Sequence, residues 1–293
     1  MKILGTGLSG LVGSRIVELT SDIWFFENLS LETGVDITNK ETLATYFHNC
    51  DAPWVFHFAA YTNVQEAEKE KPMGTLSTAW KVNVAATENI AEMCRQTNKH
   101  LVYLDTDYAF DGKERSYSED NTHYPLGWYA ITKYEGAKRV LSLGENGLVA
   151  RIANPYRAHP VGKQDFVHKM IDMFQQRKEV LGATDQLFVP TFIDDIARAL
   201  RVLIEGSYHG LYHVVGSDAL NPYHAALTVA ETFGFPKSLV KPTTFDRMFS
   251  GRAPIPQYAD LKNDKIHSLG VEMKTFAQGL NEVKSQELQV KKV

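Results

Sequence analysis

The stretch Lys2-Ile-Leu-Gly-Thr-Gly-Leu-Ser-Gly-Leu-Val-Gly13 decides the fold of this chain of 293 residues. Its first five residues predict a short strand, and a helical pattern begins at Leu11. Gly7 permits a tight turn, Gly10 lets the backbone approach a pyrophosphate, and Gly13 allows close contact between helix and strand. The helix presents its unpaired N–H groups to the phosphates. We therefore predict a dinucleotide-binding turn, and an ordinary turn with chance glycines is the alternative.

Strands alternate with helices through the first half of the chain. The sequence predicts strands at residues 2–6, 23–27, 54–59, 100–105 and 148–152, and helices at 11–19, 40–48, 75–97 and 129–141. Alternation at these lengths favours an α/β fold with a doubly wound parallel sheet, the Rossmann fold.

After Arg151 the pattern becomes less regular. The sequence predicts helices at residues 166–177, 192–204 and 223–233, a strand at 210–215, and a proline-rich loop at 242–256. We expect a smaller mixed C-terminal substrate-binding lobe over the carboxyl ends of the strands, where such sheets bind ligands. The predicted organisation is a dinucleotide-binding domain at 1–160, to which parts of 187–235 return, and a substrate-binding lobe at 161–186 and 236–293.

The composition is that of an ordinary globular protein, with 44% hydrophobic and 23% charged residues. The net charge of −4 and the lack of a dense Lys/Arg run argue against a nucleic-acid partner. Cys50 and Cys94 lack metal-type spacing, and the ten histidines form no metal-binding motif, so no metal site is expected. With no signal-peptide pattern and no apolar run of membrane length, we expect a cytoplasmic protein without a membrane partner.

The segment Tyr129-Ala-Ile-Thr-Lys133 carries the predicted chemistry. Two side chains four residues apart project from one face of a helix, and an ammonium there is expected to lower the phenol pKa. Such a pair passes a proton to a carbonyl oxygen while hydride reaches its carbon. Thr106, at the end of a predicted strand, is expected to hold that carbonyl; an ordinary strand threonine is the alternative. Tyr-x-x-x-Lys is weak alone and strong after the glycine turn.

Two acidic positions bear on the choice of cofactor. Glu27 lies 20 residues after Gly7, at the end of a predicted strand, where its carboxylate accepts hydrogen bonds from the adenosine ribose. This favours NAD mildly over NADP, since a carboxylate repels a 2′-phosphate; a solvated glutamate is the alternative. Asp36 and Ile37 either border the adenine or form a turn before a helix.

Other candidates follow the third predicted strand and lie in the longest helix. Small residues after Phe58 let the chain pass close to the cofactor, unless they serve only strand packing. Asn83 is a poor helix former, so we expect it either to brace Lys133 through water or to lie on the surface. The predicted cofactor-binding residues are Gly7, Ser9, Gly10, Leu11, Val12, Gly13, Glu27, Asp36, Ile37, Phe58, Ala59, Ala60, Tyr61, Asn83, Tyr129 and Lys133.

Together these motifs resemble the extended short-chain dehydrogenase/reductases, and more narrowly the dTDP-4-dehydrorhamnose reductase group. The segments that carry the resemblance are 58–68, 106–112, 129–133, 185–191, 195–197 and 210–213. The resemblance implies an oxidoreductase that transfers hydride from NAD or NADP to the 4-keto group of a nucleotide-linked deoxysugar, with Thr106, Tyr129 and Lys133 as catalytic residues. A homodimer is ordinary for that superfamily. The expected substrate-binding residues are Thr106, Asp107, Tyr108, Asn154, Gln186 and Arg252.

Three departures from the group leave the substrate open. Asp105 stands where the family usually has Ser, the segment after Arg151 lacks the usual Trp, and Arg-Arg-Pro becomes Arg-Ala-Pro at residues 252–254. Two other functions therefore remain. One is a nucleotide-sugar epimerase or dehydratase, since dehydratases also place an acid where Asp107 lies. The other is a non-catalytic regulatory subunit resembling the methionine adenosyltransferase β subunit. The presence of Thr106, Tyr129 and Lys133 argues against this second function.

Overall fold

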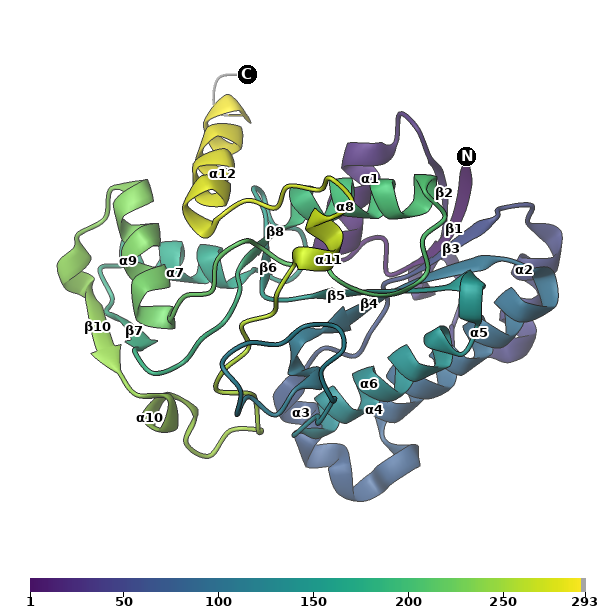
Figure 1. Ribbon diagram of the computed structural model, residues 1–293, viewed down its shortest axis with the longest axis horizontal. Coiled ribbons are helices and arrows are strands. Elements are labelled where there is room, and N and C mark those ends of the chain that lie inside the picture. The colour runs from purple at the N-terminus through teal and green to yellow at the C-terminus, as the bar shows by residue number, and fades with distance from the viewer. Residues whose placement is uncertain (291–293) are drawn as a thin grey trace.

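A parallel sheet of six strands forms the centre of the computed structural model, which describes residues 1–290 (Figure 1). The strands are β1 (Lys2–Thr6), β2 (Phe25–Leu29), β3 (Trp54–His57), β4 (His100–Thr106), β5 (Gly147–Ile152) and β9 (Gly210–His213). Their order across the sheet is β2-β1-β3-β4-β5-β9, and every neighbouring pair is parallel. The predicted doubly wound α/β fold is confirmed.

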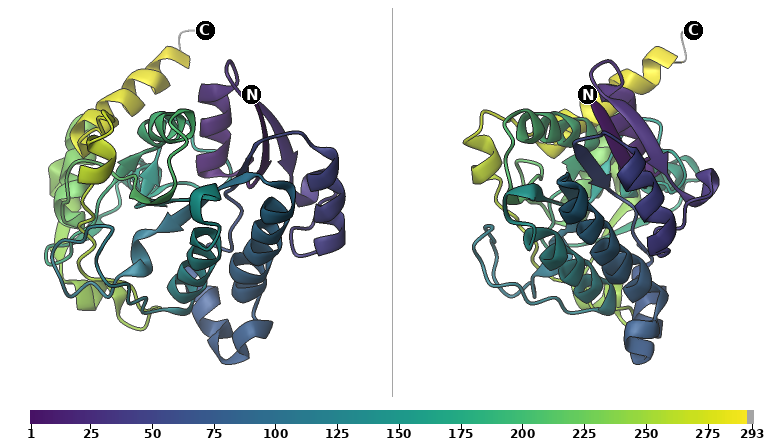
Figure 2. Two further views of the ribbon diagram at one scale, coloured as in Figure 1. Left: turned by 45° about the vertical axis from the view of Figure 1, so that its right-hand side comes forward. Right: turned by 90° about the vertical axis from the view of Figure 1, so that its right-hand side faces the viewer.

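Helices cover both faces of this sheet (Figure 2). On one face lie α1 (Leu11–Thr20) and α8 (Ile193–Glu205); on the other lie α2 (Lys40–Asn49), α5 (Ala86–Thr97) and α6 (Trp128–Leu141). Alternation along the strands supplies both apolar layers. Ile3 packs with Ile16 and Leu200 on the first face, whereas Leu4 packs with Ile90 on the second.

The predicted helix at 75–97 is confirmed from Thr78 onward, since the chain is helical without interruption from Thr78 to Thr97. This helix consists of α4 (Thr78–Trp80), the π-helical segment η3 (Lys81–Ala85) and α5, and it is preceded by α3 (Val64–Glu70) and the 3₁₀ segment η2 (Lys71–Leu76). Gly74 has a φ of 54°, which interrupts helical geometry. The Ser77 hydroxyl then accepts from the N–H of Trp80 and starts a new helix.

The rest of the chain forms a smaller, mixed part on the opposite side from β2 (Figure 1). Its strands are β6 (Pro155–Tyr156) with β8 (Thr191–Phe192), and β7 (Val180–Ala183) with β10 (Val240–Thr243). Its helices are α7 (Phe166–Gln175), α9 (Pro222–Phe233), α10 (Phe245–Phe249) and α12 (Phe276–Val290), whereas α11 (Asp264–His267) packs against β9 of the central sheet. Short 3₁₀ turns lie at η1 (Leu31–Thr33), η4 (Asp107–Ala109), η5 (Gly144–Asn146) and η6 (Lys237–Leu239).

The predicted loop at 242–256 is therefore partly wrong. Pro242 lies in β10, which belongs to a two-stranded sheet and so has a free edge that tolerates a proline. Helix α10 follows, capped by the Thr244 hydroxyl. The domain boundaries remain a prediction, and residues 291–293 of the predicted lobe lie outside the described residues. Among residues 1–290, no helix has both the length and the apolar character needed to cross a membrane.

A buried arginine ties distant parts of the chain together. Arg15 of α1 donates from Nε and Nη2 to the two carboxylate oxygens of Asp194 in α8, at 2.7 Å each. Nη2 also donates to Oε1 of Gln286 in α12, at 2.8 Å. The start of the chain is thus bonded to its last helix.

Candidate active site

The glycine turn is built from backbone atoms in close contact. Gly7 has a φ of 68°, and a Cβ there would lie 2.3 Å from the N atom of Ala59. A Cβ on Gly13 would lie 2.4 Å from the carbonyl oxygen of Gly7. Gly10 differs, because its Cβ would meet only that same oxygen, at 3.3 Å. Two glycines are therefore required by the fold, and the exposed Gly10 leaves space outside it.

That space lies at the start of α1. Gly10 is the N-cap residue and supplies no side chain to the first N–H groups of the helix. Ser9 and Gly10 are exposed, while Leu11 and Val12 are half-buried. The half-buried segment 58–61 lies beside this turn, since the N–H of Phe58 bonds to Thr6 O at 3.0 Å. The structure thus brings together most of the residues predicted to hold a cofactor.

Glu27 does not end its strand as predicted. The chain turns at residues 21–23, so β2 begins at Phe25, ends at Leu29, and pairs Glu27 with Leu4. The Glu27 carboxylate bonds to Nζ of Lys2 at 2.8 Å. It therefore lies two residues before the edge at which the glycine turn begins.

Asp36 and Ile37 have the features of a local turn. The Asp36 carboxylate accepts from the backbone N–H and the hydroxyl of Thr38, at 2.9 and 2.7 Å. Ile37 packs against the apolar layer beneath α2 and α5. These contacts match the alternative of a turn before a helix, and any contact with adenine stays a prediction.

Thr106, Tyr129 and Lys133 meet at the carboxyl edge of the sheet. Thr106 ends β4, and both other residues lie on α6, which packs against that strand. Lys133 is buried, its Nζ donates to Leu104 O at 2.7 Å, and it lies 3.9 Å from the centre of the Tyr103 ring. The Thr106 hydroxyl donates to Oδ1 of Asp107 at 3.1 Å.

The pKa of Tyr129 corrects one prediction. Burial raises this pKa well above its ordinary value; Asp105 and Asp107 raise it further, and only the Thr106 hydroxyl opposes them. The expected lowering by Lys133 is therefore absent from this structure. Burial lowers the pKa of Lys133 to about 8, although the charge of Asp105 opposes the change. Tyr129 is thus a protonated phenol, a proton donor rather than a base.

Asn83 is buried, so the alternative of a surface asparagine is wrong. Its Oδ1 accepts from the N–H of Tyr61 at 2.8 Å, and its Nδ2 donates to the hydroxyl of Thr132 at 3.0 Å. The π-helical segment η3 carries this side chain. Asn83 therefore ties the loop beside the glycine turn to the helix that carries Tyr129 and Lys133.

A cavity of about 190 Å³ lies next to Thr106. Its lining residues are Asp107, Tyr108, Asn154, Phe166, Met170, Gln186, Leu187, Phe188, Pro222, Met248, Phe249, Ile255, Pro256 and Ala259. Four predicted substrate-binding residues are among them. Thr106 lies beside the lining, and the sixth, Arg252, is exposed and lies over the ring of Phe249, 5.7 Å from its centre. The apolar lining from α7 and α10 had no signal in the sequence.

Three polar residues of this cavity are unusual. Burial raises the pKa of Asp107 to about 7. Asn154 has a φ of 41°, a strained value for a residue other than glycine, and its Nδ2 lies 3.4 Å from Oδ2 of Asp107. Oε1 of Gln186 is buried and has no hydrogen-bond partner among residues 1–290. A buried acceptor without a donor is expected where a ligand supplies one.

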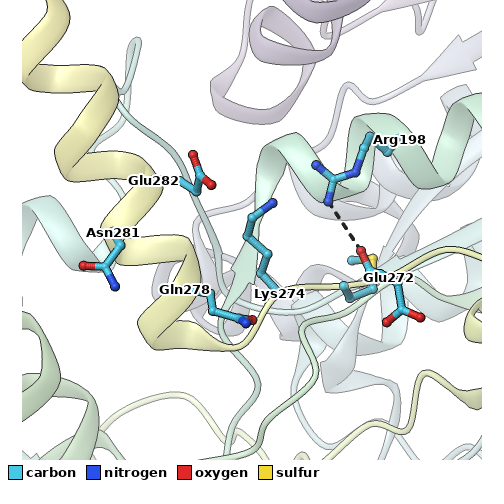
Figure 3. A pocket seen from close by; sticks show the side chains of 7 residues that line it. Arg198, Glu272, Lys274, Gln278, Asn281 and Glu282 are labelled. Carbon is cyan, nitrogen blue, oxygen red and sulfur yellow. Dashed lines mark hydrogen bonds between the residues drawn. The ribbon is translucent and has the colours of Figure 1, made fainter.

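A larger cavity of about 520 Å³ lies elsewhere, between α8 and α12 (Figure 3). Its lining includes Arg198, Glu272, Lys274 and Glu282. Its two cationic side chains, Arg198 and Lys274, both form ion pairs with the buried Asp195. This cavity is lined by other residues than those predicted for the site, and its cations are engaged in holding the fold.

Comparisons with known proteins agree with this arrangement. The family model of the RmlD substrate binding domain matches residues 1–288. A dTDP-4-dehydrorhamnose reductase of Aggregatibacter actinomycetemcomitans is 30% identical over 237 residues, 78% of either chain. The methionine adenosyltransferase 2 subunit beta of Xenopus laevis is 26% identical over 296 residues, 96% of this chain and 86% of the relative.

A solved structure is similar over nearly its whole length. It is the Bacillus anthracis dTDP-4-dehydrorhamnose reductase in complex with NADP, which is 25% identical and covers 97% of this chain and 99% of its own, with a TM-score of 0.88. Since the family model spans almost all of the sequence, the resemblance predicted from the motifs is confirmed, and this chain belongs to the RmlD substrate binding domain family of dTDP-4-dehydrorhamnose reductase-like proteins.

Proposed function

We propose that this protein is a nicotinamide-dependent reductase that acts on the 4-keto group of a nucleotide-linked deoxysugar. The observation that supports it most is the meeting of Thr106, Tyr129 and Lys133 at one edge of the sheet. Asn83 links these residues to the glycine turn, and Asp107 links them to the cavity. The reductase relatives support the choice of chemistry.

The residues at the turn fit a dinucleotide. The uncapped start of α1 suits a pyrophosphate, because its N–H groups are free of side-chain acceptors from the N-cap. The proposed contacts are those predicted from the sequence, with Glu27 and Asp36 toward the adenosine. When bound, the nicotinamide supplies hydride. NAD and NADP both remain candidates: Glu27 favours NAD, whereas the Bacillus anthracis relative is in complex with NADP.

The remaining steps belong to the side chains. The Thr106 hydroxyl, which here donates to Asp107, turns to hydrogen-bond the substrate carbonyl. Tyr129, held protonated by burial, donates its proton to the oxygen as hydride reaches the carbon. Lys133 stabilises the phenolate that is left and contacts the nicotinamide ribose. The apolar walls of the cavity exclude water from the reacting carbon.

One other function is supported by a specific finding. The methionine adenosyltransferase subunit covers more of this chain than the Aggregatibacter reductase does, at 96% against 78%. A regulatory subunit would bind the dinucleotide without turnover. The retained Tyr129 and Lys133 favour the reductase.

The test is a panel of nucleotide-linked 4-keto sugars assayed for NADH and NADPH oxidation. We expect oxidation with at least one sugar. Dinucleotide binding without oxidation of any member of the panel would contradict the reductase and favour the regulatory subunit.

A further inference from the structure

Three neighbouring strands carry a row of buried ionisable side chains beneath α6. Asp105 of β4 pairs in register with Arg151 of β5, and Arg151 pairs with His213 of β9. Residues in register across parallel strands point to the same face. Tyr103, two residues earlier in β4, shares that face, and Lys133 of α6 lies over its ring. The row therefore lies under the helix that carries the proposed catalytic pair.

Arg151 is the centre of the row. Its Nε donates to Oδ2 of Asp105 at 2.9 Å, its Nη2 forms an ion pair with the same oxygen at 2.9 Å, and both side chains are at most 1% exposed. Its Nη1 donates to Nε2 of His123 at 2.7 Å. Burial and the arginine charge lower the pKa of His123 to about 4 and that of His213 well below its ordinary value. The two histidines are neutral, so the row carries one positive and one negative charge.

The second oxygen of Asp105 is left over. Oδ1 is buried and has no hydrogen-bond partner among residues 1–290, because Arg151 contacts Oδ2 alone. Nζ of Lys133 donates to Leu104 O, which belongs to the peptide group that joins Leu104 to Asp105. No ion pair joins Lys133 to Asp105 in the described residues, so the charge of Asp105 acts on the buried ammonium across the peptide group that precedes it. A buried ammonium needs such a counterion.

We propose that Asp105 is the buried counterion of Lys133, shared with Arg151, and is a positioning residue that keeps Lys133 in its ammonium form. The dTDP-4-dehydrorhamnose reductase group usually has Ser at this position, so the counterion is a feature of this chain. Its meaning for catalysis rests on the proposed function, whereas the ionisation of Lys133 does not.

The direction in which Asp105→Asn shifts the pKa of Lys133 depends on the charged and titratable groups around the ammonium. These groups are His57 on β3, Tyr103 and Asp105 on β4, Asp107 on η4, His123 in the following loop, Tyr129 on α6, Arg151 on β5 and His213 on β9. Burial and Lys133 lower the pKa of His57 to about 3, so that ring is neutral. Asp105→Asn removes a negative charge and leaves Arg151 uncompensated. Both changes disfavour the ammonium.

The test follows the ionisation of Lys133 directly. In protein labelled with ¹³C at lysine Cε, the Lys133 signal is assigned by its loss in Lys133→Met. We expect it to titrate at about 8 in the parent protein and at about 7 or below in Asp105→Asn. Asp105→Glu keeps the charge and should titrate nearer the parent value. A folded Asp105→Asn protein with an unchanged Lys133 titration would overturn the proposal.

Two additions keep the test decisive. Asp105→Ser, with the family's residue, replaces Asp105→Asn if the amide prevents folding, and a parent Lys133 that titrates below about 6 overturns the proposal without any variant. Asp111→Asn is the matched control, since that carboxylate accepts from the Tyr117 hydroxyl and lies outside the row. It should leave Lys133 unchanged.

A measurement of turnover distinguishes the counterion role of Asp105 from the proposed reductase activity. On an active sugar, the fall of kcat as pH rises through the Lys133 titration should begin about one pH unit lower in Asp105→Asn. Absence of turnover with any sugar would contradict the reductase but leave the ionisation result standing. A shift of kcat without a shift of the Lys133 signal would contradict the counterion.

Discussion

The two halves of the candidate site are constructed differently. The glycine turn is made of backbone contacts, in which Gly7 and Gly13 have no room for a Cβ. The cavity beside Thr106 is made of side chains from α7, α10 and several loops. A few consecutive residues determine a site built from backbone atoms, whereas a site built from side chains depends on segments far apart in the sequence. Cofactor binding and substrate choice should therefore respond separately to substitution.

The largest loss of turnover is expected at Tyr129, between the glycine turn and the cavity. Tyr129→Phe removes one oxygen and little volume, so cofactor affinity should change little. Turnover should fall by about two to four orders of magnitude, the usual contribution of a placed general acid. Single-turnover NADH oxidation on an active substrate measures it. Equal rates in the two proteins would remove Tyr129 from the mechanism.

The glycine turn itself offers a matched pair of variants. Gly10→Val places its Cβ 3.3 Å from one oxygen, so the protein should fold, while the approach of a pyrophosphate is blocked. Titration calorimetry should show NADH affinity lower by about a hundredfold or more. Gly13→Ala places its Cβ 2.4 Å from Gly7 O and should destabilise the fold itself. Unchanged NADH affinity in Gly10→Val would contradict the assignment of this turn.

Gln186→Leu tests the cavity alone. If its orphaned Oε1 accepts a hydrogen bond from the substrate, the variant should raise KM by about ten- to a hundredfold. NADH affinity should stay as in the parent protein. Met248→Leu, an apolar exchange in the same lining, is the control. A KM equally changed in both variants would mean that Gln186 only fills space.

Asp107 gives the smallest expected effect, on stability. Its pKa is raised from 3.8 to about 7, so between these values the folded protein holds a proton that the unfolded chain has lost. Its contribution to stability is present below pH 3.8 and is lost as the pH rises through about 7. Asp107→Asn should therefore melt above the parent at pH 8, and the difference in Tm should be smaller at pH 5. A constant difference in Tm would contradict the raised pKa.

The sequence predicted what local patterns specify. The parallel sheet follows from alternating strands and helices, and the glycine turn and the pair on α6 follow from short spacings. Glu27 was displaced from its strand end because a turn at residues 21–23 shifted the strand. The helix predicted at 75–97 begins at Thr78, and the π-helical geometry of residues 81–85 within it has no local sequence signal.

The other features that the sequence did not predict depend on tertiary packing. The pKa of Tyr129 is raised chiefly by burial and then by the charges of Asp105 and Asp107, none of which the spacing along α6 indicates. The cavity lining joins Met170 to Ile255 across distant segments. Pro242 appeared to forbid a strand, yet an edge strand accommodates it.

The bond between Arg15 and Gln286 has a consequence for how the protein is made. A ribosome extrudes the glycine turn well before α12, because 271 positions separate the two bonded side chains. Until Gln286 emerges, the guanidinium two residues beyond Gly13 lacks one of its partners. A chain stalled before residue 286 should therefore hold α1 with Asp194 but without this contact to α12.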